Sequence, residues 1–154
     1  MRIETETMIA APPMRVWRAL ADFGAYPRWH PYREIVGEAA LNARVTMKIG
    51  PQPEQRHSIK ATITAFEPGD CLAFTTGRWI FGRATETYML LPSPRGTRLR
   101  HSTEMMGLGA LFARRGPFVS RLQGVYQRVD AALNRFVTTG APGQPSVKKG
   151  RRRR

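Results

Sequence analysis

The feature that most constrains the fold is a series of strand-like segments between residues 34 and 106, separated only by turns. Apolar and polar residues alternate within these segments, as over 43–49, and the dipeptide Gly50-Pro51 marks one of the turns. The predicted strands cover residues 34–39, 43–49, 57–67, 71–77, 82–91 and 96–106. Six strands with no helix between them predict an antiparallel meander, because parallel strands need long crossover connections.

One long helix is predicted after the meander, and a shorter helix before it. After Pro117, apolar residues recur every three or four positions and would line one face of a helix. This stripe consists of Phe118, Leu122, Val125, Val129, Leu133 and Phe136. Near the N-terminus, residues 2–10 alternate as a strand, and Pro12 and Pro13 suit the first turn of a helix over 13–21. The predicted fold class is α+β, with a curved antiparallel sheet facing the long helix.

Two connecting segments are rich in aromatic or apolar residues. Residues 22–32, DFGAYPRWHPY, contain too much proline for a long helix and are predicted to form a short helical turn that ends at Pro27. By composition, Phe23 and Trp29 either plug the core or line a binding site, and both alternatives stay open. Residues 107–117 are predicted to form a plain turn, with a lid over a pocket as the alternative.

This order of elements is that of the helix-grip fold. The chain resembles the START-like superfamily of polyketide cyclases, lipid-transfer domains and the birch pollen allergen, and in particular its small bacterial SRPBCC, or polyketide-cyclase/dehydrase-like, members. The resemblance is carried by IAAPPMRVWRALADFGAYPRWHPY (9–32), Pro68-Gly69 before Cys71-Leu72-Ala73-Phe74, TYMLLP (87–92), GTRLRHSTEMMG (96–107) and ALNRF (132–136). It implies a ligand cavity between the sheet and the C-terminal helix, with residues 22–32 closing one end, but no particular ligand or reaction.

Strand alternation brings an acid and an imidazole, Glu86 and His101, to the same face of neighbouring strands. This pair is the one weak candidate for acid–base catalysis. The alternatives are a structural hydrogen-bonded pair, or a Glu86 that reaches water at the cavity mouth. The candidate ligand-binding residues are Trp29, His30, Tyr32, Phe74, Glu86, Tyr88, His101, Thr103, Met105, Phe112, Phe118 and Leu122.

The chain departs from the pattern of the relatives it resembles. Such relatives often carry His-x-Phe-x-Leu where this chain has Glu86, Tyr88 and Leu90, and they place a glutamate near Thr103. Here Glu104 lies in the opposite strand phase from Thr103, unless a bulge turns it inward. If those family positions touch ligand, the ligand preference of this chain differs from theirs.

Composition and charge bear on partners and location. The chain carries a formal net charge of +14, and six of these charges lie in KKGRRRR at 148–154. We predict one ligand-binding domain over 1–139 and a disordered basic tail over 140–154, which either makes weak polyanion contacts or has no function. The single cysteine, Cys71, excludes an internal disulfide and suits a reducing cytoplasm. We expect a cytoplasmic monomer or homodimer.

Several classes of site and segment find no support in the sequence. The charged N-terminal segment does not resemble a signal peptide, and no apolar run is long enough for a transmembrane helix. The three histidines, His30, His57 and His101, are scattered, so no metal site is expected, and we expect no cofactor.

Three functional classes therefore stay open. The leading hypothesis is a protein that binds or carries a small hydrophobic or aromatic molecule. The second is an enzyme of the polyketide cyclase, aromatase or dehydratase type, in which Glu86 and His101 would move protons. The third is docking to RNA, ribosomes or an acidic surface through the arginines and the tail. Satisfied polar groups in a deep apolar cavity favour the first class, and a Glu–His pair open to a ligand-sized void favours the second.

Overall fold

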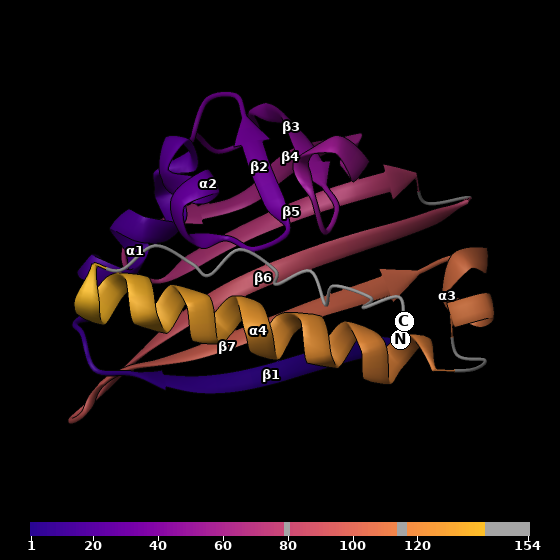
Figure 1. Cartoon of the computed structure of the whole chain (residues 1–154). Coiled ribbons are helices and arrows are strands. Elements are labelled where there is room, and N and C mark those ends of the chain that lie inside the picture. The colour runs from indigo at the N-terminus through magenta and orange to yellow at the C-terminus, as the bar shows by residue number, and fades with distance from the viewer. Residues whose placement is uncertain (79–80, 114–116, 141–154) are drawn as a thin grey trace, which may run out of the picture.

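The computed structural model describes residues 1–78, 81–113 and 117–140. A strand and three short helices come first, then six strands, and two helices end the described chain (Figure 1). In order, the elements are β1 (Arg2–Ile9), α1 (Pro13–Ala21), the 3-10 helix η1 (Phe23–Ala25), α2 (Tyr26–Trp29), β2 (Arg33–Val36), β3 (Arg44–Ile49), the 3-10 helix η2 (Pro53–Gln55), β4 (His57–Glu67), β5 (Cys71–Arg78), β6 (Gly82–Ser93), β7 (Gly96–Met106), α3 (Leu108–Ala113) and α4 (Phe118–Thr139).

The strands form a seven-stranded antiparallel sheet in the order β1-β7-β6-β5-β4-β3-β2. The predicted meander is confirmed, and β1 adds to its far edge by pairing with β7. In Figure 1 the long helix α4 runs across one face of the sheet, η1 and α2 pack against β2, and α3 lies at the other end, beside β6 and β7. This is the helix-grip arrangement, in which α4 packs along β1 and also contacts α1 and α2.

Most predicted boundaries agree with the structure, and the exceptions have local causes. The first predicted strand of the meander ends early, at Val36, because Gly37 adopts a φ of 141° that breaks the extended run. Pro27 does not end a helical turn but lies in the first turn of α2, where its missing N–H would be unpaired anyway. The predicted plain turn after β7 is wrong, because α3 occupies Leu108–Ala113.

The aromatic segment 22–32 belongs to the core. Phe23, Tyr26 and Trp29 are buried, and Trp29 is only 1% exposed. Their rings pack against one another, with centroids 5.8 Å apart for Phe23 and Tyr26 and 4.8 Å apart for Tyr26 and Trp29. Phe23 also reaches Phe74 on β5, at 5.8 Å between ring centroids. The segment therefore closes the end of the sheet near β2 with tightly packed rings.

The apolar stripe of α4 is covered unequally along its length. Val129 and Leu133, in the C-terminal half, are buried against the sheet and α1, as the stripe predicted. At the start of the helix, Phe118 is 42% exposed and Leu122 is only half-buried. The core thus holds the second half of α4, and its first half keeps apolar surface that the described chain leaves partly uncovered.

Two glycines give a matched test of this backbone. Gly96 follows the β6–β7 turn at a φ of 127°, and a Cβ there would lie 2.3 Å from the carbonyl oxygen of Ile9. Gly96→Ala should therefore lower the free energy of unfolding by about 1–3 kcal/mol. Gly124 lies within α4, where a Cβ has its nearest neighbour at 3.8 Å, so Gly124→Ala should raise stability by roughly 0.5–1 kcal/mol. Urea denaturation measures both, and equal effects would contradict the described turn.

Candidate functional site

Glu86 lies at the centre of a buried polar network between the sheet and α4. Its Oε2 atom is 2.7 Å from Nη2 of Arg33 on β2. Its Oε1 atom is 2.9 Å from Nε2 of His101 on β7, and the Tyr88 hydroxyl donates to the same oxygen at 3.0 Å. Both carboxylate oxygens are therefore occupied by donors, as a buried charge requires.

The network continues from His101 to the long helix. The Nδ1 atom of His101 is 2.8 Å from Oδ1 of Asp130 on α4, and the Thr5 hydroxyl donates to Oδ2 of Asp130 at 2.6 Å. The imidazole also lies between two aromatic rings, with centroids 4.2 Å from Tyr88 and 4.1 Å from Tyr126. Side chains of β2, β6, β7, α4 and β1 thus meet in one contiguous arrangement, which we call the Glu86 network.

Burial and charge set the protonation states in this network. Burial alone would raise the pKa of Glu86, but the Arg33 guanidinium and the bond with His101 hold that pKa well below its usual range. Burial alone would lower the pKa of His101, but its bonds with Asp130 and Glu86 raise it. Glu86 is therefore ionised, and His101 keeps its proton to a higher pH than a free imidazole does; Arg33 and Asp130 are the partners that complete the two pairs.

This geometry favours the structural alternative for the Glu86–His101 pair. A general base needs a free lone pair within reach of a substrate proton, and a general acid needs a proton to release at its working pH. Both oxygens of Glu86 accept hydrogen bonds from the chain, and both nitrogens of His101 are bound to carboxylates. Glu86 and His101 do meet, but the lone pairs and protons that acid–base catalysis would use are engaged by Arg33, Tyr88 and Asp130.

Sequence reasoning missed two essential members of the network. Arg33 begins β2 in the same phase as the buried Ile35, which was a usable signal for an inward-facing charge. Asp130 follows Val129 in the apolar stripe of α4, and it is fully buried. An acid on the covered face of an amphipathic helix needs a partner, so its position pointed to a buried contact.

The predicted ligand-binding residues divide into four groups. Phe74, Tyr88, His101 and Thr103 are buried on the inner face of the sheet together with Glu86, whose side chain keeps 12% exposure, and Trp29 and His30 are buried as well. Met105 and Leu122 are half-buried, as is Tyr32, whose hydroxyl accepts a 2.6 Å hydrogen bond from Nε of Arg128. Phe118 is exposed at the start of α4. The side chain of Phe112 falls outside the described residues.

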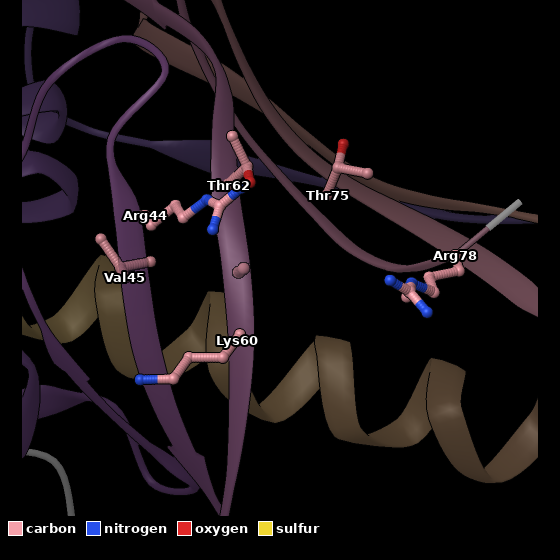
Figure 2. A pocket seen from close by; sticks show the side chains of 8 residues that line it. Arg44, Val45, Lys60, Thr62, Thr75 and Arg78 are labelled. Atoms are coloured by element: carbon pink, nitrogen blue, oxygen red, sulfur yellow. The ribbon is translucent and has the colours of Figure 1, made fainter.

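A separate hollow of about 540 Å³ lies where β4 and β5 part (Figure 2). The two strands pair up to Ala61 and Thr76, and beyond that point β4 pairs only with β3 and β5 only with β6. The hollow is lined by Arg44, Val45, Lys60, Ala61, Thr62, Thr75, Gly77 and Arg78. None of these eight residues is acidic, so the hollow suits anionic groups, although its cations are exposed and salt would weaken any such contact.

The described part of the chain lacks two further features. It contains no group of three or more histidine, cysteine, aspartate or glutamate side chains placed to hold a metal ion. None of its helices combines the length and apolar character needed to cross a membrane.

The family of the chain follows from residues 1–139, which match the family described as polyketide cyclase / dehydrase and lipid transport. The chain belongs to this family. The match spans the whole sheet and α4, and the family identity agrees with the resemblance read from the sequence. No curated protein matches the sequence.

Solved structures show the same fold at low sequence identity. Protein CV1439 from Chromobacterium violaceum is 21% identical, with 88% of this chain and 96% of that chain covered at a TM-score of 0.72. DynU16, a protein in the dynemicin biosynthetic locus, is 18% identical, and the match covers 92% of this chain and 48% of that chain at a TM-score of 0.71. Ara h 8.0201 is 14% identical, and the match covers 89% of this chain and 97% of that chain at a TM-score of 0.66. At these identities the likeness establishes the helix-grip fold of this polyketide cyclase/dehydrase family member.

The raised pKa of His101 predicts a pH dependence of stability. A histidine has a pKa of about 6.5 when unfolded, so the contribution of His101 is complete below that pH. It is lost as the pH rises through the raised folded-state pKa. The pKa of His30 is lowered, first by burial, so its contribution to stability is present above about pH 6.5 and is lost only as the pH falls below that value. Between pH 6.5 and 9 the free energy of unfolding should therefore fall.

The variant His101→Asn isolates this effect. It removes the titrating ring, so its stability should be lower at pH 6.5 and should change less up to pH 9 than that of the wild type. Urea titrations at four pH values give the slope of the free energy of unfolding against pH for each protein. Parallel slopes for the two proteins would show that His101 is not protonated in the folded state.

Proposed function

We propose that this family member binds and carries a small hydrophobic or aromatic molecule held between the sheet and α4. The observation that carries the proposal is the uncovered apolar surface along the first half of α4. Leu122 and Val125 are half-buried there, and Met105 at the end of β7 is half-buried on the inward phase of its strand. Partly uncovered apolar side chains of this kind are what a ligand cavity offers to an apolar molecule.

Exposed apolar side chains also gather at the end of the molecule where this half of α4 begins. They lie at the start of β6, the end of β7, α3 and the start of α4, which meet at one end of the fold (Figure 1). The residues are Phe81, Met106, Leu108, Leu111 and Phe118. An apolar ligand entering from this end would pass over surface that matches it.

The family description supports a hydrophobic ligand, since it joins polyketide chemistry and lipid transport. The fold likeness to DynU16 of the dynemicin biosynthetic locus points in the same direction. A cyclase or dehydratase activity finds less support, because the oxygens of Glu86 and the nitrogens of His101 are engaged by other side chains of the protein. Contact with polyanions stays a proposal for the basic hollow and for residues 141–154, which lie outside the described part.

A pair of leucines on α4 separates binding from folding. Leu133 is fully buried, so Leu133→Ala should lower the free energy of unfolding by about 2–5 kcal/mol. Leu122→Ala should lower it by less, and should instead weaken binding of the apolar fluorophore N-phenyl-1-naphthylamine by about tenfold, from loss of apolar contact. Fluorescence titration measures the affinity and urea denaturation measures the stability of each variant.

The control for this experiment is Arg98→Ala, since Arg98 is exposed on β7 and its approach to Glu6 is a loose 3.7 Å. This change should leave the affinity for the fluorophore unchanged. Binding of about one equivalent to the wild type, with loss in Leu122→Ala alone, would support the proposal. A wild-type protein that binds no fluorophore would refute it.

A further inference from the structure

The hollow between β4 and β5 gathers three cations that no carboxylate of the described chain balances. Arg44, Lys60 and Arg78 line it, and Figure 2 shows Arg78 on β5 facing the other two across the gap. None of the three forms an ion pair with any described residue. Cations elsewhere on the sheet surface do, since Nη2 of Arg2 lies 2.6 Å from Oε2 of Glu4. The hollow therefore concentrates positive charge that the described chain leaves unneutralised.

The gap between the two strands is built into the backbone. Gly77 on β5 adopts a φ of 80°, and a Cβ there would lie 2.1 Å from the carbonyl oxygen of Gly82. This close approach keeps the end of β5 on β6, where Gly77 pairs with Arg83 and Arg78 with Gly82, while β4 continues along β3. The hollow thus depends on main-chain geometry rather than on the rotamer of one side chain.

The same gap leaves backbone groups of Lys60 without a partner strand. Ile63 donates its N–H to Ala43 and accepts a hydrogen bond from the N–H of Asn42, so both of its backbone groups point to the β3 side. These directions alternate along an antiparallel strand, so the N–H and C=O of Lys60, three residues away, point to the β5 side. The ladder between β4 and β5 ends before Lys60. Its N–H therefore faces the hollow as a donor without a ladder partner.

Hydroxyl and ammonium groups complete the lining. Thr62 and Thr75 lie opposite each other where the strands still pair, and both are half-buried. The ammonium group of Lys60 donates to the Thr46 hydroxyl at 2.7 Å and keeps its other N–H groups. The volume of about 540 Å³ lies within the range of sites that hold small molecules. The hollow thus offers charged, hydroxyl and backbone donors in a space of suitable size.

We infer that the hollow is a second binding site of this protein, for a phosphate group carried by a small molecule or by a lipid headgroup. A phosphate ester has about two negative charges at pH 7 and three strong acceptor oxygens, whereas a carboxylate has a single charge. Several converging cations are therefore better balanced by phosphate, and guanidinium groups match its oxygens in pairs. The inference goes beyond the carrier function, because no residue of the hollow belongs to the surface proposed for the apolar ligand.

Calorimetric titration of the full chain with inorganic pyrophosphate tests this site. The hollow variant combines Arg44→Gln, Lys60→Gln and Arg78→Gln, which remove the three charges from exposed positions and leave the core unchanged. Its affinity for pyrophosphate should fall by at least about tenfold, because three charge-assisted contacts are lost. The wild-type affinity should decrease as the salt concentration rises, since the three cations are exposed.

A control variant of equal charge carries Arg15→Gln, Arg18→Gln and Arg135→Gln, at exposed positions of α1 and α4 that do not line the hollow. Both variants lose three charges from the formal net charge of +14 and keep the basic segment at 148–154. The control should lose less than about twofold in affinity for pyrophosphate. Equal losses in the two variants would show that binding follows net charge alone and would refute the site, as would a wild type that binds no pyrophosphate.

Two further titrations define the chemistry and the source of the phosphate. Citrate is a compact polyanion without phosphate, and citrate binding as tight as that of pyrophosphate would overturn the phosphate assignment. Vesicles of equal parts phosphatidylcholine and phosphatidic acid present the group as a headgroup. Flotation of the wild type and the control variant with these vesicles, but not of the hollow variant, would assign the site to a lipid. Binding of pyrophosphate without flotation would assign it to a soluble phosphate compound.

The apolar fluorophore keeps this inference separate from the binding proposal. The hollow variant should bind N-phenyl-1-naphthylamine as the wild type does, because the substituted residues lie outside the surface proposed for that ligand. Loss of pyrophosphate binding in the hollow variant, with fluorophore binding retained, is the result expected. A hollow variant that loses both would show that the substitutions disturb the fold and that the hollow is not an independent site.

Discussion

The ion pair between Arg33 and Glu86 fixes the curvature on which the rest of the structure depends. Arg33 lies on β2, at one edge of the sheet, and Glu86 lies on β6, with three strands between them. In a flat sheet, four spacings of about 4.8 Å would separate these strands by about 19 Å. Their charged groups are nevertheless 2.7 Å apart. The sheet must therefore curl so that β2 approaches the inner face at β6. The ion pair between Arg33 and Glu86 stabilises this curled form.

The same network positions the long helix. Asp130 joins α4 to His101 on β7 and to Thr5 on β1, near the middle of the helix. Apolar packing around Leu133 then covers the C-terminal half, whereas the half that begins at Phe118 extends past the anchored region with apolar surface partly open. The satisfied carboxylates at the centre and the partly open apolar side chains where α4 begins are the two features on which the proposed binding function rests.

The sequence predicted those parts of the molecule that depend on local pattern. Strand alternation placed Glu86 and His101 on one inner face, and helical spacing placed Leu133 on the covered face of α4, because both periods follow from backbone geometry. The pairing of Arg33 with Glu86 was not predicted, since it joins strands that are not neighbours and depends on curvature. Phe118 and Leu122 were named as ligand-lining residues, but the sequence could not predict how far along α4 other elements reach, because spacing defines only a face of the helix.

The coupling between Arg33 and Glu86 tests the central claim most directly. A double-mutant cycle with Arg33→Met, Glu86→Gln and the double variant, followed by urea denaturation, measures it. Either single change leaves a buried charge unpaired and should lower the free energy of unfolding by about 3–5 kcal/mol. The double variant should lose less than the sum of the two, by about 1–3 kcal/mol. Strictly additive losses would show that the two residues do not interact, and would contradict the account of a sheet held closed by this pair.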